Sequence, residues 1–267
     1  MRKSEISQIR YFFTISVFLF IIFTLSFCNK TDNNTTSTPN TTSTTKDGAI
    51  SITSVVQSKY TSAVTISTSG NSIVLKSNGT PDHVTPYWGK GNALYEAPSL
   101  TGQTVNPGNL QSQVFAMTIP SNPNEATTKE ATSLGPIGMA LNGVAIYNDR
   151  EGGNVPVDAG TLLSFDRGGA HSGPGGLYHY HFTGDWIGND DAKLIGFLRD
   201  GYPIYARKDK DGTYPSSLDA NGGHISVTNE FPNGIYHYHA SNTAYMGGRF
   251  YVLKSGSYYG TKGTFTF

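Results

Sequence analysis

The sequence contains one hexapeptide pattern twice: GLYHYH at 176–181 and GIYHYH at 234–239. Side chains along a β-strand alternate between the two faces of a sheet. Each copy therefore places two histidines on one face and two tyrosines on the other. A strand pattern that occurs twice in one chain predicts an all-β protein in which one structural unit is repeated.

Two further blocks repeat in the same order. IGMALNGVAIY at 137–147 aligns with IGFLRDGYPIY at 195–205, and the offset between these copies is the same as for the hexapeptides. DRGGAH at 166–171 aligns with DANGGH at 219–224 at a slightly smaller offset. The Asn-Gly and Asp-Gly dipeptides predict hairpins with type I′ turns, whose two central residues both need positive φ. The repeat halves cover about 135–182 and 193–240.

The composition supports this fold class. Charged residues make up only 14% of the chain, and glycine and tyrosine are abundant, which is typical of short strands joined by many turns. Outside the repeat, alternating apolar residues predict strands at 64–67 and 72–75 around a turn at 68–71, and another at 114–120. We expect a single sandwich- or barrel-like domain over residues 48–267, with an internal duplication.

The N-terminus is typical of an export signal. It has three basic residues and then an uncharged, mostly apolar run at 11–27, which ends at Cys28. This arrangement resembles a bacterial lipoprotein signal, with a signal peptide at 1–27 and a lipidated Cys28, although Phe27 departs from the small residue usually found there. An uncleaved membrane anchor is the alternative, but the run is short compared with the ~20 residues of a spanning helix.

Residues 28–47 contain mostly Thr, Asn and Ser, which predicts a disordered tether after the lipidated cysteine. The expected location is therefore the bacterial cell envelope, on the periplasmic or the surface side, with the membrane contacted through the lipid. Because Cys28 is the only cysteine, the domain has no internal disulfide. The formal net charge is zero, so electrostatics give no reason to expect a nucleic acid partner.

The histidines are the main candidate functional residues. Six of the seven belong to the repeat: His171, His179, His181, His224, His237 and His239. A His-x-His pair on a strand with one more distant histidine is a common ligand set for zinc or copper. Three arrangements fit: one site per repeat, one four-histidine site where the strands meet, or one functional site beside a degenerate copy. Duplication of the third histidine favours one site per repeat.

Other residues are candidates for supporting roles. Asp166 and Asp219 are predicted to complete each site or to orient a ligand, or else to be simple turn residues. His83 follows a turn and is a candidate ligand or catalytic base, or else a structural histidine with hydrogen-bond partners in its loop. A hydrolytic metal site would draw its general base from these three residues, and whether the metal is catalytic is left open. The acidic stretch at 209–212 lacks the later carboxylates of an EF-hand calcium loop.

These motifs together resemble those of the YHYH-domain proteins over nearly all of 48–250. The resemblance implies an exported bacterial protein, often a lipoprotein, and implies no particular reaction. Many members carry cysteines beside the Gly-His blocks, where this chain has glycine or alanine, so histidine, aspartate and tyrosine are left as candidate ligands. The matching blocks are SNGTPDH at 77–83, GPIGMALNGVAIYN at 135–148, DRGGAH at 166–171, GGLYHYH at 175–181, LIGFLRDGYPIYA at 194–206, LDANGGH at 218–224 and NGIYHYH at 233–239.

A non-enzymatic surface module is the alternative function. In that hypothesis the Tyr/His strands are structural, and exposed aromatic residues bind a glycan or a partner protein. The aromatic candidates are Trp88, Trp186, Tyr258 and Tyr259. Replacing His179 or His237 by alanine separates the two hypotheses, because only a metal protein loses bound metal while keeping its fold.

Overall fold

The structure, a computed structural model, describes residues 50–267. The predicted signal peptide at 1–27, Cys28 and the tether at 28–47 lie outside the described residues. Within the described part, no helix is both long enough and apolar enough to cross a membrane.

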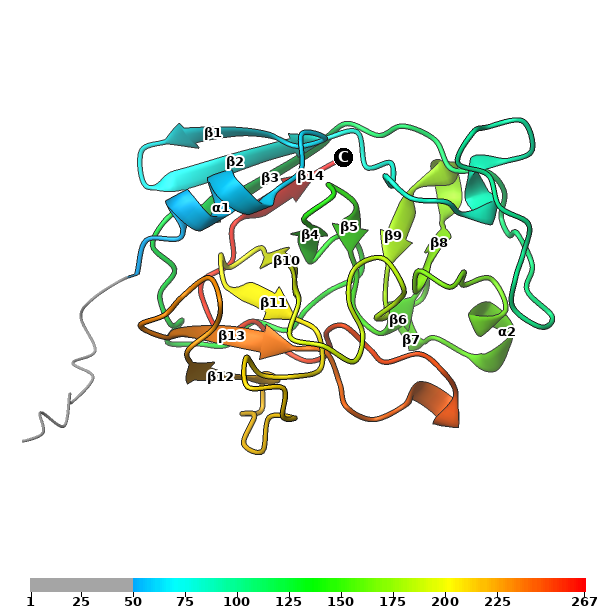
Figure 1. Cartoon of the computed structure of the whole chain (residues 1–267). Coiled ribbons are helices and arrows are strands. Elements are labelled where there is room, and N and C mark those ends of the chain that lie inside the picture. The colour runs from blue at the N-terminus through cyan, green and yellow to red at the C-terminus, as the bar shows by residue number, and fades with distance from the viewer. Residues whose placement is uncertain (1–49) are drawn as a thin grey trace, which may run out of the picture. The chain divides into compact units, whose positions relative to one another are not determined.

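The repeat forms an eight-stranded sheet with the order β12-β13-β11-β10-β4-β5-β9-β8 (Figure 1). In each half, the second strand of a hairpin pairs in parallel with the Tyr-His strand. That strand in turn pairs antiparallel with the strand carrying the upstream histidine. The predicted internal duplication is therefore confirmed in the topology. One half consists of β4 (Gly138–Ala140), β5 (Ala145–Ile146), β8 (Ala170–Ser172) and β9 (Tyr178–Tyr180), and the other of β10 (Leu194–Leu198), β11 (Pro203–Tyr205), β12 (Gly223–Ser226) and β13 (Ile235–His239).

The two halves meet at the antiparallel pair β4 and β10. Met139 lies opposite Phe197, with Gly138 opposite Leu198 on one side and Gly196 opposite Ala140 on the other. The repeat alignment exchanges these pairs, so a pseudo-two-fold axis passes through the pair of Met139 and Phe197. Both glycines are required, because a Cβ on Gly196 would lie 2.2 Å from a backbone oxygen and one on Gly138 2.7 Å.

The hairpin turns differ from the predicted type I′. In the first turn the Ala140 N–H donates to the Val144 carbonyl at 2.9 Å, and the Gly143 N–H donates to the Ala140 carbonyl at 2.8 Å. This is a three-residue loop, in which only the last residue needs positive φ. Gly143 (φ 87°) and its counterpart Gly201 (φ 83°) supply that conformation, while Asn142 is not among the residues with positive φ. The type I′ prediction is wrong because the loop has one more residue than a type I′ hairpin.

A second sheet has the order β1-β2-β3-β14. The predicted strands at 64–67, 72–75 and 114–120 are confirmed as β1, β2 and β3. Buried and more exposed residues alternate along β3, so one face of this sheet is turned toward the core. The sheet consists of β1 (Thr65–Ser69), β2 (Ser72–Ser77), β3 (Phe115–Pro120) and β14 (Thr264–Thr266), and the shorter elements are α1 (Thr53–Lys59), η1 (Pro86–Trp88), β6 (Arg150–Glu151), β7 (Val155–Pro156), α2 (Ala159–Leu162), η2 (Pro174–Gly176) and η3 (Tyr245–Gly247).

One hydrophobic core joins the two sheets. Leu75 of β2 and Met117 of β3 belong to the same buried cluster as Met139 and Phe197 at the pseudo-two-fold axis. Tyr60, directly after α1, donates its hydroxyl to the Met139 carbonyl at 2.9 Å, and its ring stacks on that of Phe197 with 6.1 Å between centroids. The predicted all-β, sandwich-like fold is confirmed, and no sheet of the described part closes into a barrel.

Candidate metal centre

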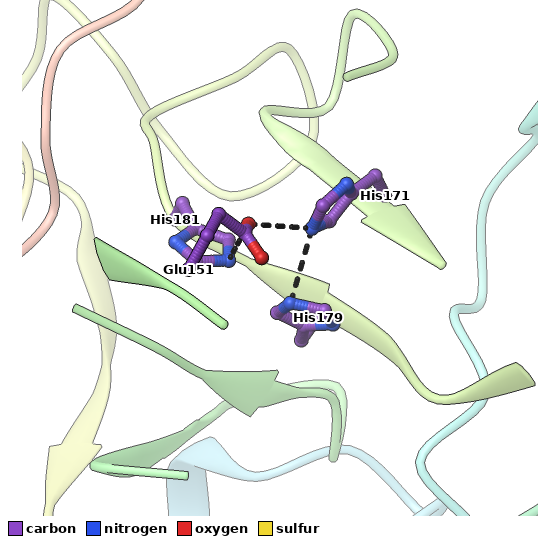
Figure 2. A group of neighbouring side chains, drawn as sticks. All are labelled: Glu151, His171, His179 and His181. Atoms are coloured by element: carbon purple, nitrogen blue, oxygen red, sulfur yellow. Dashed lines mark hydrogen bonds and ion pairs between the residues drawn. The ribbon is translucent and has the colours of Figure 1, made fainter. Parts of the chain in front are cut away.

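Three histidines and a glutamate converge at one end of the eight-stranded sheet. His171 of β8 lies directly opposite His179 of β9, so both side chains project from the same face. His181 follows two residues later on that face, and Glu151 reaches the group from β6 (Figure 2). We call Glu151, His171, His179 and His181 the first cluster.

Donor atoms in the first cluster are closely spaced. The Nε2 atoms of His171 and His179 lie 3.2 Å apart. Glu151 Oε1 lies 3.1 Å from His171 Nε2 and 3.3 Å from His181 Nε2. All four residues offer a ligand atom within 4.8 Å of one another.

The other half holds a second cluster of the same design at the opposite end of the sheet, made of Asp209, His224, His237 and His239. His224 lies opposite His237 across β12 and β13, and their Nε2 atoms are 3.2 Å apart. Asp209 Oδ1 lies 3.1 Å from His224 Nε2 and 3.3 Å from His239 Nε2. These three distances equal those in the first cluster, so the duplication extends to the donor geometry.

Backbone carbonyls fix the orientation of four of these imidazoles. His179 Nδ1 donates to the Leu177 carbonyl at 2.9 Å, and His181 Nδ1 to the Asn148 carbonyl at 2.5 Å. A carbonyl only accepts, so Nδ1 carries the proton and the lone pair of Nε2 faces the centre of the cluster. His237 and His239 are held in the same way, by the carbonyls of Ile235 and Ala206.

Ser164 fixes the tautomer of His171. The Ser164 hydroxyl donates to the Thr161 carbonyl at 2.7 Å, so its oxygen accepts from His171 Nδ1, also at 2.7 Å. In the neutral, metal-binding form of His171, the Nε2 lone pair therefore faces that of His179 with no proton between them. Two lone pairs held this close together repel each other unless a cation lies between them.

Burial lowers the pKa of four of the cluster histidines. It lowers the pKa of His181 to about 3 and that of His179 well below its usual value. In the second cluster, burial lowers the pKa of His237 to about 4 and also lowers the pKa of His239. Neutral imidazole is the form that binds a metal, so at neutral pH these four residues need not lose a proton to do so.

Some buried atoms in the clusters lack a hydrogen-bond partner. His181 Nε2 and His239 Nε2 are buried, and neither has a hydrogen-bonding partner among the described residues. Glu151 Oε1 is also buried without a hydrogen bond there. An unpartnered buried polar atom is costly, which indicates that something else satisfies these three.

The predicted additional ligands Asp166 and Asp219 lie on the tyrosine face of the sheet. Asp166 accepts the hydroxyl of Tyr178 at 2.7 Å and the N–H of Gly168 at 2.9 Å. Asp219 accepts the hydroxyl of Tyr236 at 3.0 Å. The structure thus places both aspartates against the first tyrosine of each motif, and neither belongs to a histidine cluster.

His83 also lies on the tyrosine face. Its Nδ1 donates to the Val84 carbonyl at 3.0 Å, so its Nε2 accepts the hydroxyl of Tyr180 at 2.7 Å. Its ring stacks on Trp186 with 5.2 Å between centroids. Burial lowers the pKa of His83. The structure places this histidine outside both clusters, next to the second tyrosine of the first motif.

The second tyrosine of each motif holds the hairpin turn of its own half. Tyr180 accepts from the Asn142 side chain at 3.1 Å, and Tyr238 donates to Asp200 at 2.5 Å. The turn residue and the tyrosine are equivalent in the two halves. The tyrosines of the motif therefore have a structural role, while the histidines on the opposite face form the clusters.

Sequence reasoning missed Glu151 and Asp209. A signal for them exists, because they are separated by the same offset as the two hexapeptides and each follows a tyrosine by four positions, Tyr147 and Tyr205. The aligned blocks end at those tyrosines, and the acidic stretch at 209–212 has the character of an incomplete calcium loop. Of the three arrangements left open by the sequence, the structure shows one cluster in each half.

Comparison with known proteins supports the resemblance and adds no activity. The family model described as YHYH protein matches residues 116–217. The matched segment contains all of the first cluster and Asp209, and it ends before the three histidines of the second cluster. No curated protein and no solved structure matches the chain.

Proposed function

We propose that this chain, a member of the YHYH protein family, binds two divalent transition metal ions, zinc or copper, one in each histidine cluster. The observation that carries the proposal is the convergence of His171 Nε2 and His179 Nε2 at 3.2 Å beside a carboxylate, in a group whose four ligand atoms lie within 4.8 Å of one another. A metal ion is the partner that satisfies several converging lone pairs at once.

The donor set fits such an ion chemically. Three neutral imidazoles and one carboxylate suit zinc, and imidazole also suits copper. A tetrahedral site with bonds of about 2.0 Å has donors about 3.3 Å apart. In each cluster three donor pairs lie between 3.1 and 3.3 Å apart. This spacing favours zinc over copper(II), which prefers a square-planar or tetragonal arrangement.

The surface-module alternative receives less support. Of its aromatic candidates, Tyr258 is 1% exposed and Trp186 is packed between His83 and the guanidinium of Arg167. Trp88 and Tyr259 are partly buried against the hydrophobic core. None of the four stands free on the surface as a stacking platform.

Metal analysis tests the proposal. Purified chain without a histidine-rich tag is expected to contain about two equivalents of one transition metal by plasma mass spectrometry. His179→Ala and His237→Ala are each expected to remove one equivalent and to leave the fold intact. His83→Ala is the matched control, because this buried histidine lies outside both clusters, and it should keep both equivalents.

The result that contradicts the proposal is equally clear. A folded protein that carries no transition metal, and whose melting temperature does not change with added zinc or copper, has structural histidines. A search for a protein or glycan partner would then follow.

We further propose that the protein is exported and lipid-anchored through Cys28, on the support of the N-terminal sequence pattern. Cys28→Ser is expected to move the protein from the membrane fraction to the soluble fraction. A variant that stays with the membrane would indicate an uncleaved anchor instead.

A further inference from the structure

The two clusters differ in the space beside them. A cavity of about 490 Å³ adjoins the first cluster, and Glu151 and His171 form part of its wall. This volume lies within the range of ~300–1,000 Å³ that is usual for small-molecule sites. The hollow beside the second cluster, lined by Asp209, His237 and His239, has no room for a water molecule.

Polar groups line the cavity. Its wall includes Thr104, Asn106, Asp158, Thr161, Ser164 and Ser172. None of the described residues that line it is lysine or arginine. The Ser172 hydroxyl is buried and has no hydrogen-bond partner among the described residues, so it is available to a ligand. Hydroxyl and amide groups without a cation suit an uncharged molecule that forms hydrogen bonds.

The carboxylates of Glu151 and Asp158 affect the site in different ways. Glu151 has 27% of its side chain exposed, whereas His181 is fully buried. Among the first-cluster donors, Glu151 and His171 are those that an entering molecule meets. A bound divalent ion offsets the charge of its ligand Glu151, so Asp158 is the carboxylate of the wall that disfavours an anion through like-charge repulsion.

Resting on the proposed metal binding, we infer that the first cluster and its cavity form an open site for a small, uncharged polar molecule bearing hydroxyl or amine groups. The ligand reaches the metal from the side of Glu151, while its polar groups contact Ser172 and the surrounding hydroxyls. The second cluster is closed and stabilises the fold. This assignment gives the two copies of one unit different roles.

Cobalt(II) provides a spectroscopic test, because its visible absorption changes when a new ligand binds the metal. The full chain is loaded with cobalt(II) and titrated at about pH 8 with imidazole, a small molecule that is mostly uncharged there. We expect imidazole to change the absorption of the first cluster only. His237→Gln does not alter the first cluster, so this variant should keep the response. His179→Gln removes a donor from the first cluster and should lose the response.

A variant that touches no donor provides the second measurement. Gly160 lines the cavity, and a Cβ there would meet only the Asp158 carboxylate at 3.4 Å, so a larger side chain fits locally. Gly160→Phe should fill the cavity and weaken imidazole binding by about tenfold or more, with cobalt content unchanged. Gly160→Ala, the matched control, should bind imidazole as the wild type does.

The charge preference is tested with azide as an anionic probe. Asp158→Asn removes one carboxylate from the wall and keeps a residue that also caps helices well. Azide should bind this variant several-fold more tightly than the wild type, because one like charge is removed. Imidazole affinity should stay the same. Equal azide affinity in the two proteins would overturn the preference for uncharged molecules.

The outcomes separate this inference from the proposed function. If both clusters bind cobalt(II) but imidazole causes no change, acts at the second cluster, or acts equally in Gly160→Phe, the open site is wrong and metal binding stands. If neither cluster binds cobalt(II), zinc or copper, both proposals fail.

Discussion

The first and the second cluster hold their donors at matching distances but differ in their surroundings. In the first half, the Phe165 ring stacks on His171 with 4.1 Å between centroids, and Ser164 fixes the imidazole. The aligned position of Phe165 in the second half is Leu218, which is exposed, and His224 is only partly buried. The paired strands therefore set the positions of the ligands, while the loops determine which other side chains contact them.

The turns of the two halves show the same contrast. Asn142 donates to Asp82 Oδ1 at 3.0 Å and to the hydroxyl of Tyr180. At the equivalent position Asp200 accepts from the hydroxyl of Tyr238 and from the N–H of Gly260 at 2.9 Å. One position thus carries a donor in the first half and an acceptor in the second, matched to partners of opposite polarity.

Of the experiments that compare the two clusters, metal removal is expected to have the largest effect, which is on thermal stability. A metal at about a thousand times its dissociation constant stabilises the fold by ~4 kcal/mol per site, because it binds only the folded state. A chelator should therefore lower the melting temperature by about 10 °C or more. His179→Ala and His237→Ala should each abolish part of this shift in calorimetry. If either variant abolished all of it, the clusters would not be independent sites.

Exchanging the turn residues tests the second contrast. Asn142→Asp places a carboxylate beside that of Asp82 and is expected to destabilise the fold by ~3 kcal/mol in urea denaturation. Asp200→Asn should cost ~2 kcal/mol, because an amide nitrogen replaces one of the two oxygens that accept from Tyr238, Gly260 and Tyr202. Adding Asp82→Asn to Asn142→Asp should restore most of the loss. Tolerance of both single exchanges would show that the turns are interchangeable.

Acid should destabilise the metal-free protein in both halves. Burial holds the pKa of His181 at about 3 and that of His237 at about 4, below the value near 6.5 of an unfolded histidine. Below about pH 6.5 the unfolded state therefore binds more protons than the folded state. The free energy of unfolding has its full value above about pH 6.5, and each of these histidines lowers it by ~1.4 kcal/mol for every pH unit below that.

Variants assign this acid dependence to each half. His181→Gln and His237→Gln should each flatten the fall in unfolding free energy between about pH 6.5 and 4. A slope unchanged by both substitutions would mean that other groups control the acid transition.

The smallest effect concerns the fixed tautomer. Ser164→Ala removes the partner of His171 Nδ1 and should weaken zinc binding at the first cluster by about tenfold. Ser217 is the aligned residue of the second half, and among the described residues it makes no hydrogen bond with His224. Ser217→Ala should change zinc affinity little in titrations against a competing chelator. Equal effects of the two substitutions would remove this difference between the clusters.

The sequence predicted the sheet and the histidine faces because both depend on local alternation. The period of two in the Tyr-His-Tyr-His strands fixes which side chains share a face, whatever the rest of the chain does. The repeat of the hairpins and of the blocks at 166–171 and 219–224 then predicted that His171 and His224 lie near these strands.

The carboxylates of the clusters could not be predicted in this way. Glu151 and Asp209 approach from loops that return over the histidine face, and their paths depend on long-range pairing rather than on a local period. Asp166 and Asp219 were equally suitable by spacing, but the structure places them on the tyrosine face, where their carboxylates accept the tyrosine hydroxyls. The turn type also depended on loop length, which the Asn-Gly and Asp-Gly dipeptides do not determine.

The register at the pseudo-two-fold axis is self-complementary. Residue 138 faces 198 and residue 196 faces 140, so the two halves pair through equivalent edges of equivalent strands. A single half would present this edge to an identical copy in the same register, as in a symmetric homodimer with an isologous interface. The present chain has the geometry of such a dimer fused into one polypeptide. Fusion frees each copy to change alone, which symmetry would forbid in two identical subunits.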